Sequence, residues 1–534
     1  MTESSVAEDF HYFSLQIPPG ANQVNCNKIV IMPLKVLIMK VRGFFLTFMI
    51  VIAGVFIAVS CITDTDSGIL FIPREPVIEP DYSGVTIPPN IAQLNFRILE
   101  DGVYFTIKCF SPDGRDLFSI KSKNGIVRFP SRLWTKLLTE NRGRSVRFEI
   151  SSINNDGKIS KYIPVTLDIS NERIDPYICY RLLYPGYESW SEMQIIQRSV
   201  EDFRESVIFD NRVMKNNCVN CHTFLKYDPG KFFLHVRGSL KGTYFIENKD
   251  LTRRILRTDN MTSNAVYPAW HPGGRYIVFS SNAVVQSFNM IPGKRIEVYD
   301  QTSGLVIYDS EYNKISAIEE KDTTEYMDTF PCWSPGGDYL YYCRTNQVKE
   351  SFDFSKIKYN LVRKVFDQSS GLFGETEVIF KAEDIDKSVT LPSISPDGNY
   401  LVFTLHDYGT FSIWHKEADL YLLDLTNGRI NRMTLNSDES ESHHAWSSNG
   451  KWIVFSSKRS DGITARPYFA YFGSPDNVGK PFVLPQKDPD LYEKLAKTFN
   501  RPEFVSGKVV AGPRDFARAS KDEPAYATWS ETTR

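Results

Sequence analysis

One short segment recurs four times in the second half of the chain, and no other feature constrains the fold as strongly. The copies are YPAWHPGGRYIVFSS (267–281), FPCWSPGGDYLYYCR (330–344), LPSISPDGNYLVFTL (391–405) and HHAWSSNGKWIVFSS (443–457). Each places a large apolar residue before a turn rich in Pro, Gly or Asn, and an apolar strand after it. The large residues Trp270, Trp333, Ile394 and Trp446 are 63, 61 and 52 residues apart. This pattern predicts the blades of a β-propeller.

The copies resemble the WD-like repeats of TolB-type propellers, in which Trp-Ser-Pro-Asp-Gly precedes an apolar strand. With NCVNCHTF, IWHKEADLYLLDL and FSSKRSDG, they make residues 80 to 515 similar to a family of TolB-like lipoproteins from Bacteroidetes-type bacteria, often labelled cytochrome c biosynthesis proteins. The resemblance implies a propeller, here expected over residues 230–515. FFLHVRGSLKGTYFIENKD (232–250) supplies a fifth unit, so five to six blades are expected. Residues 516–534 would form a C-terminal tail.

The region before the repeats has two predicted parts. The segments LNFRILE, VYFTIKCF, SVRFEISSI and KYIPVTLDI predict short strands divided by turns, and hence an immunoglobulin-like β-sandwich over residues 85–175. Apolar residues recur every three to four positions over 189–206, which predicts a helix there. Residues 176–229 would then be a short helical linker. The predicted fold class is all-β: a sandwich, this linker and a TolB-like propeller.

The N-terminal region carries an export signal that begins at Met39. Residues 39–61, MKVRGFFLTFMIVIAGVFIAVSC, hold two cations, an apolar run and small residues before Cys61, which is the layout of a lipoprotein signal with an acylated Cys61. The alternative is an uncleaved membrane anchor. Both place the rest of the chain outside the cytoplasm, membrane-anchored in the envelope (periplasm or outer membrane) of a Gram-negative bacterium. Residues 1–38 would be a non-native leader, and residues 62–84 a tether.

The most specific chemical motif is NNCVNCHTF, in which Cys218, Cys221 and His222 spell Cys-x-x-Cys-His. The motif is the attachment site of a c-type haem: the two thiols add to the porphyrin vinyl groups and the His is the proximal iron ligand. Haem c is therefore the expected cofactor. Two alternatives remain: a structural disulfide or redox pair, and half of a zinc site.

A haem iron can take a sixth ligand from elsewhere in the chain. His235 follows the motif in FLHVRG, and His271 stands where the other repeats have Ser334, Ser395 and Ser447. The alternative for either His is a structural role, such as capping a turn. A further pair, Cys332 and Cys343, lies symmetrically about the turn SPGGD. They are expected to be either a cross-strand disulfide or two buried thiols.

The sequence lacks the motifs that mark several classes of function. The chain has no G-x-S-x-G and no G-x-x-x-x-G-K-[ST], so neither a serine hydrolase nor a P-loop nucleotide site is expected. The net charge is −2, which offers no basic field for nucleic acid. Two hypotheses follow. The chain is a lipid-anchored mono-haem electron carrier that meets an envelope redox partner, or it is a non-haem scaffold that binds a peptide or envelope protein at the propeller mouth.

Overall fold

The computed structural model describes residues 69–186, 192–288, 296–318, 325–348 and 353–531, except the side chain of Cys221. The predicted leader, the signal segment and Cys61 lie outside these residues. The chain from Gly68 onward forms one compact unit, built mainly of β-strands. Within the described ranges, no helix has the length and apolar character needed to cross a membrane.

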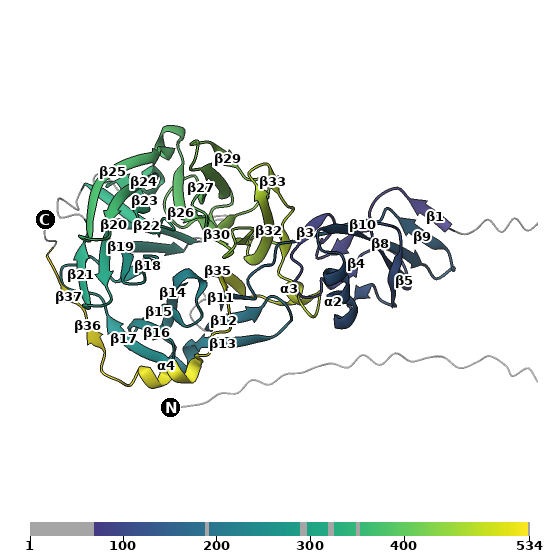
Figure 1. Ribbon diagram of the computed structural model, residues 1–534, viewed down its shortest axis with the longest axis horizontal. Helices are drawn as coiled ribbons and strands as arrows, with labels where there is room; N and C mark the ends of the chain where they lie inside the picture. Colours follow the sequence, from purple (N-terminus) through teal and green to yellow (C-terminus); the bar gives the residue numbers. More distant parts are fainter. Residues whose placement is uncertain (1–68, 187–191, 289–295, 319–324, 349–352, 532–534) are drawn as a thin grey trace, which may run out of the picture. The chain divides into compact units, whose positions relative to one another are not determined.

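Six mainly antiparallel sheets of the described chain are arranged about a common centre in a propeller-like manner (Figure 1). Five of them follow one another along the sequence. The first contains β14 (Cys218–Phe224), β15 (Lys231–Arg237), β16 (Gly242–Glu247) and β17 (Asp250–Ile255); the second β18 (Ala265–Trp270), β19 (Tyr276–Phe288), β20 (Ile296–Asp309) and β21 (Lys314–Ala317); the third β22 (Tyr326–Trp333), β23 (Tyr339–Asn346), β24 (Asn360–Asp367) and β25 (Leu372–Phe380); the fourth β26 (Ser388–Ile394), β27 (Tyr400–His406), β28 (Asp419–Asp424) and β29 (Ile430–Arg432); the fifth β30 (Glu441–Trp446), β31 (Trp452–Ser457), β32 (Arg466–Ser474), β33 (Asn477–Val478) and β34 (Phe482–Val483).

The sixth sheet joins two distant parts of the chain. It contains β11 (Tyr177–Leu183), β12 (Met193–Ser199), β13 (Glu205–Asp210) and β35 (Thr498–Val505), in the order β13-β12-β11-β35. Its inner strand β35 contacts β30 of the fifth sheet, and β12 contacts β14 of the first. The sixth sheet therefore closes the ring.

The C-terminal residues add strands to the outside of the ring. After α3 (Leu491–Lys494) and β35 come α4 (Pro513–Ala519), β36 (Ala525–Tyr526) and β37 (Thr528–Trp529). β36 pairs in parallel with β17, and β37 pairs with β21. The predicted tail thus covers the outer edges of the first two sheets. Short 3-10 turns also occur at η2 (Asn211–Met214), η3 (Leu225–Tyr227), η4 (Phe354–Lys356), η5 (Ala382–Ile385) and η6 (Ser412–Trp414).

The prediction of a helical linker over residues 176–229 was wrong. Strands β11 to β14 occupy this region, and all seven residues of β12 are buried. The apolar spacing wrongly predicted a helix because β12 is an interior strand. It pairs with β11 and β13 at its edges, and both of its faces are also buried, so its sequence lacks the alternation of polar and apolar residues that marks a half-exposed strand. The CxxCH segment is the inner strand of the first sheet, which therefore begins before residue 230.

The domain ahead of the ring consists of two sheets and one helix. The seven-stranded sheet contains β1 (Ile69–Ile72), β3 (Val85–Ile87), β5 (Tyr104–Phe110), β6 (Asp116–Ser122), β8 (Arg144–Ile153), β9 (Ile159–Tyr162) and β10 (Val165–Ile169); the three-stranded sheet contains β2 (Ile78–Glu79), β4 (Phe96–Ile98) and β7 (Ile126–Val127). Helix α2 (Ser131–Glu140) was not predicted. It buries Trp134, Leu137 and Leu138, whose spacing places them on one helical face.

The tether predicted over residues 62–84 is shorter than expected. Residues 69–72 form β1, which pairs in parallel with β9 at the edge of the large sheet, and residues 78–79 form β2, which pairs with β4. The prolines of this segment lie outside these strands, where the missing N–H of proline interrupts no hydrogen bond between strands. Only residues 62–68 separate Cys61 from the first strand.

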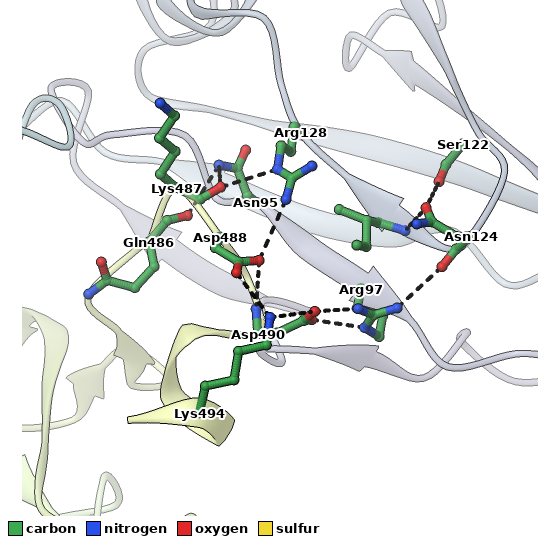
Figure 2. Close-up of polar contacts among 11 residues, drawn as sticks. Asn95, Arg97, Ser122, Asn124, Arg128, Gln486, Lys487, Asp488, Asp490 and Lys494 are labelled. Atoms are coloured by element: carbon green, nitrogen blue, oxygen red, sulfur yellow. Dashed lines mark hydrogen bonds and ion pairs between the residues drawn. The ribbon is translucent and has the colours of Figure 1, made fainter. Parts of the chain in front are cut away.

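The N-terminal domain and the ring share a hydrophobic core. Buried residues of the large sheet, such as Ile107, belong to the same cluster as Trp452 and Phe469 of the fifth sheet and Phe504 of the sixth. Polar contacts reinforce this junction (Figure 2). Arg97 Nε donates to Asp490 Oδ1 over 2.8 Å. The N-terminal domain and the ring are therefore packed against each other, without a solvent-exposed linker at the boundary expected near residue 175.

Candidate functional site

The same backbone irregularity occurs in the inner strand of all six sheets. In five of them, two residues of the inner strand lie opposite one residue of its neighbour, and in β14 residue 221 is the extra one. The first residue of each two-residue bulge has a positive φ: Tyr267 (46°), Phe330 (51°), Leu391 (54°), His443 (48°) and Arg501 (49°). We call these five residues the bulge ring. A positive φ strains the backbone of a non-glycine residue by about 1–3 kcal/mol, and such strain concentrates at functional sites.

The bulge ring lines a pocket of about 570 Å³ at the centre of the six sheets. Prolines follow four of its members, and Trp270, Trp333 and Trp446 add aromatic surface. Thr223 to Tyr227 close the wall on the side of the first sheet. The volume is in the range of ligand pockets, and the lining combines aromatic and aliphatic side chains with a nearly equal share of polar surface.

The charged and imidazole side chains of the pocket gather where the fifth, sixth and first sheets meet. Arg501 and Glu503 come from β35, His443 and His444 from β30, and Lys226 from the turn after β14. Nη1 of Arg501 is buried and has no hydrogen-bond partner among the described residues. A buried guanidinium nitrogen without an acceptor loses hydrogen-bond energy, which a bound anionic or carbonyl group would restore.

Glu503 has an unusual protonation equilibrium. Its Oε1 accepts a hydrogen bond from the backbone N–H of Phe224 over 3.0 Å, and 23 % of its side chain stays exposed. Burial of the rest raises the pKa of Glu503 to about 7, although the Phe224 hydrogen bond and Arg501 oppose the shift. The carboxyl group can therefore exchange a proton near neutral pH.

His222 lies directly behind Glu503 and is 2 % exposed, and its Nε2 is 3.9 Å from Glu503 Oε2. Burial, followed by the charges of Arg501 and Arg181, lowers the pKa of His222 to about 3. His443, in the bulge ring, has its pKa lowered for the same reasons. Both imidazoles are therefore neutral, and positive charge at this end of the pocket comes from arginine and lysine.

His235 and His271, the two candidates for a sixth iron ligand, lie apart from the pocket lining. His235 in β15 is buried opposite Asn220, and its Nδ1 is 3.2 Å from Thr243 Oγ1. His271 Nδ1 accepts from the N–H of Gly273 over 3.0 Å, and its Nε2 is 3.3 Å from the Gly337 carbonyl oxygen. In the other repeats Ser334, Ser395 and Ser447 accept from the N–H five residues later. His271 therefore caps a turn, as its structural alternative predicted.

The predicted cysteine pair Cys332 and Cys343 does not form a disulfide, since both are free thiols. The bulge explains the difference. It shifts the register so that Cys332 lies opposite Tyr341 and Cys343 lies opposite Thr329. Burial raises the pKa of Cys332 to about 11 and that of Cys343 well above its usual value. Both thiols therefore stay protonated and unreactive.

The surroundings of the CxxCH motif do not fit a covalent haem. Cys218 is 6 % exposed, with its Sγ 3.9 Å from Met193 Sδ. His222 has an orphaned Nε2, which alone would suit an iron ligand, but its ring is enclosed by β11, β14 and β35. The lining of the central pocket begins at Thr223 and includes neither Cys218 nor His222. The described surroundings of Cys218 and His222 therefore offer no open pocket for a porphyrin.

Sequence reasoning missed Arg501 and Glu503, and a signal for them exists. The segment RPEF (501–504) places Pro502 and Phe504 where YPAW has Pro268 and Trp270, 58 residues after the repeat that starts at His443. It lacks the turn and apolar strand that follow in the other copies. Those strands are supplied by β11 to β13, from far upstream.

Comparisons with known proteins identify neither a family nor a function. No family model matches the chain, and no curated protein matches it. Solved structures with a similar course include a nidogen/laminin complex, at 10 % identity over 62 % of this chain and 100 % of that one, with a TM-score of 0.36. Oligogalacturonate lyase from Vibrio parahaemolyticus is 11 % identical over 64 % of this chain and 98 % of its own, with a TM-score of 0.29. The Dos1 propeller is 15 % identical over 43 % of this chain and 64 % of its own, with a TM-score of 0.26. These values carry no argument about function.

Proposed function

We propose that this protein is a membrane-anchored, extracytoplasmic binding scaffold whose central pocket receives a segment of a peptide or envelope protein. The observation that carries the proposal is the bulge ring. One strained backbone conformation is repeated around the centre, while the side chains differ from sheet to sheet. Repetition of the strain without repetition of the side chain favours recognition of an asymmetric ligand over a purely structural role.

The side chains of the pocket suggest what such a segment contains. Tyr267 and Phe330, in sheets two and three, offer aromatic surface, and Arg501, from sheet six, offers an unsatisfied donor. A ligand with an apolar or aromatic group beside a carboxylate or main-chain carbonyl would satisfy both.

The architecture that accompanies this proposal is a six-bladed propeller preceded by an immunoglobulin-like sandwich. Support for six blades comes from the six sheets and from the contact of the sixth with both the fifth and the first. Support for a sandwich comes from the large and small sheets and their common buried core. Cys61 would carry the lipid anchor, and Cys61→Ala should abolish both lipid attachment and cleavage before residue 61, which the intact mass of the protein from cells measures.

Peptide binding tests the pocket. Panning a random peptide library against the protein should enrich sequences with an apolar residue near a carboxylate. An enriched peptide should bind about tenfold more weakly or worse to Phe330→Ala and to Arg501→Gln, because each loses a buried contact of about 1.5 kcal/mol or more. Tyr312→Ala, at an exposed position outside the pocket (60 % exposed), is the control. Equal binding by all four proteins would contradict the proposal.

Covalent haem at Cys218 and Cys221, with His222 as the proximal ligand, is the competing function, and the orphaned Nε2 of His222 is the observation in its favour. Protein matured in a haem-competent periplasm should, on our proposal, show no haem stain after denaturation. Its mass around Cys218 should be that of the polypeptide. A low-spin haem spectrum that His222→Ala abolishes would overturn our proposal and favour the electron carrier instead.

A further inference from the structure

One face of the N-terminal domain carries an exposed surface close to where the chain enters the described structure. The pairing registers of β1, β9, β8, β5 and β6 align two rows of side chains on the same face of the large sheet. The first row is Ile69, Ile159, Ile153, Tyr104 and Lys123, and the second is Phe71, Lys161, Ser151, Thr106 and Lys121. We call these ten residues the outer face.

The outer face is turned away from the protein core. The alternating residues of β5, Phe105 and Ile107, are buried, so their neighbours on the same strand point outward. Ile69 is 45 %, Phe71 59 % and Tyr104 47 % exposed. Single exposed apolar residues are common, but a continuous row across four strands indicates an interaction surface.

The charges of the outer face have one sign. Its two rows contain three lysines and no carboxylate, and Lys123 Nζ lies 5.8 Å from the centre of the Tyr104 ring. The first acidic side chain of this face is Glu149, in the next row opposite Lys108. Apolar residues, a tyrosine and lysines together are what a surface needs to lie at the boundary between water and an anionic bilayer.

The length of the preceding chain favours the same partner. Ile69 follows Cys61 by eight residues, and an extended chain advances at most about 3.3–3.6 Å per residue, so about 25–30 Å separates them at most. This limit holds whether Cys61 carries the lipid or an uncleaved apolar segment spans the bilayer. The anchor therefore holds β1 close to the membrane, where even a weak surface affinity would act at high effective concentration.

We propose that the outer face rests on the surface of an anionic lipid bilayer. Ile69, Phe71 and Tyr104 enter the headgroup region, and Lys121, Lys123 and Lys161 pair with lipid phosphates. The inference rests on the proposed membrane anchor for its setting. The affinity of the face itself can be measured without the anchor, because the chain from Gly68 onward is a compact unit of its own.

Co-sedimentation with lipid vesicles tests the proposal on a protein that starts at residue 62. This protein should bind vesicles of phosphatidylcholine with phosphatidylglycerol, bind phosphatidylcholine alone less, and lose binding as salt is raised. Ile69→Asp with Phe71→Asp, and separately Lys121→Glu with Lys123→Glu, should each lower the bound fraction about fivefold or more. The matched controls are Val378→Asp, an exposed residue of β25 (59 % exposed), and Lys241→Glu with Lys249→Glu; both should bind like the parent protein.

Two results would overturn the proposal. One is binding that the outer-face variants leave unchanged, or no binding to either kind of vesicle. The other is a concentration-dependent dimer that Ile69→Asp abolishes in the absence of lipid, which would assign the face to a second copy of the chain. Failure of the anchor is a separate outcome: it would appear as an intact mass that shows cleavage elsewhere or no lipid on Cys61, and the vesicle assay does not involve Cys61.

Discussion

The sixth sheet of the ring and the four sheets that carry the repeats reach the same shape by different routes. In each of those four sheets, the first four strands come from one stretch of chain, with the inner strand first, and among the described residues only the second sheet gains a distant strand, β37, at its outer edge. In the sixth, β35 pairs with β11, and their partners are more than 300 residues apart, as Tyr177 and Val505 are. Closing such a loop costs more conformational entropy than a hairpin does. The sheet that closes the ring is therefore its least local part, and it also holds Arg501 and Glu503.

The largest expected effect follows from removing β35. A protein truncated after Lys497 lacks the inner strand of the sixth sheet and exposes the edges of β11 and β30, so it should be insoluble or unfolded. Truncation after Ala519 removes only β36 and β37 at the outer edges, and that protein should stay soluble and folded. Circular dichroism and solubility measure both. A folded protein after the longer truncation would show that the ring does not need closure by the C-terminal strand.

Unfolding of a variant with a core substitution tests whether the sixth sheet and the N-terminal domain unfold together. Phe504 is fully buried in the cluster that both share. Phe504→Ala should lower the free energy of unfolding by about 3–5 kcal/mol. The transition should remain single when followed by tryptophan fluorescence and by circular dichroism in denaturant. Phe373→Ala, in a partly buried position of β25, should cost less. Two separate transitions would instead identify independent domains.

The protonation of Glu503 distinguishes the sixth sheet by its pH dependence. Burial raises the pKa of Glu503 in the folded state to about 7, above its usual value near 4.5. The folded state therefore binds the proton more tightly, and this stabilisation is full below about pH 4.5 and is lost as pH rises through 7. Glu503→Gln should remove this loss. The free energy of unfolding of the variant should therefore rise by about 2 kcal/mol relative to that of the parent protein between pH 5 and pH 8.

Thermal unfolding across that pH range measures the effect. Glu205→Gln replaces an exposed carboxyl of the same sheet, and its melting temperature should follow that of the parent protein. A pH profile that Glu503→Gln leaves unaltered would contradict the raised pKa.

The smallest effect concerns the ion pair between Arg97 and Asp490 at the junction in Figure 2. The hydrogen bond from Arg97 lowers the pKa of Asp490, whose side chain is 9 % exposed. A double-mutant cycle with Arg97→Ala and Asp490→Ala should give a coupling of about 1 kcal/mol that weakens with salt. Arg128 and Asp488, 3.5 Å apart and more exposed, should give a smaller one. Equal couplings would mean that burial does not strengthen the first pair.

The chain sequence predicted those parts of the fold that local interactions decide. The repeats correctly located four inner strands and their turns, because the turn chemistry lies within a few residues. The glycines at 274, 337, 398 and 450 have φ between 66° and 82°, which glycine adopts without the steric cost of a side chain. The structural alternative for His271 was correct for the same reason: its partner Gly273 lies in the same turn.

Only the tertiary structure decided the features that depend on distant residues. β12 looked helical because burial on both faces hides the period of a strand, and its covering strands lie elsewhere in the chain. The bulge that separates Cys332 from Cys343 is visible only in the register with β23. The pocket depends on side chains from all six sheets, which no local pattern brings together. The sequence by itself thus determined the strands and turns of the repeats, while long-range pairing and packing decided which side chains meet at the centre.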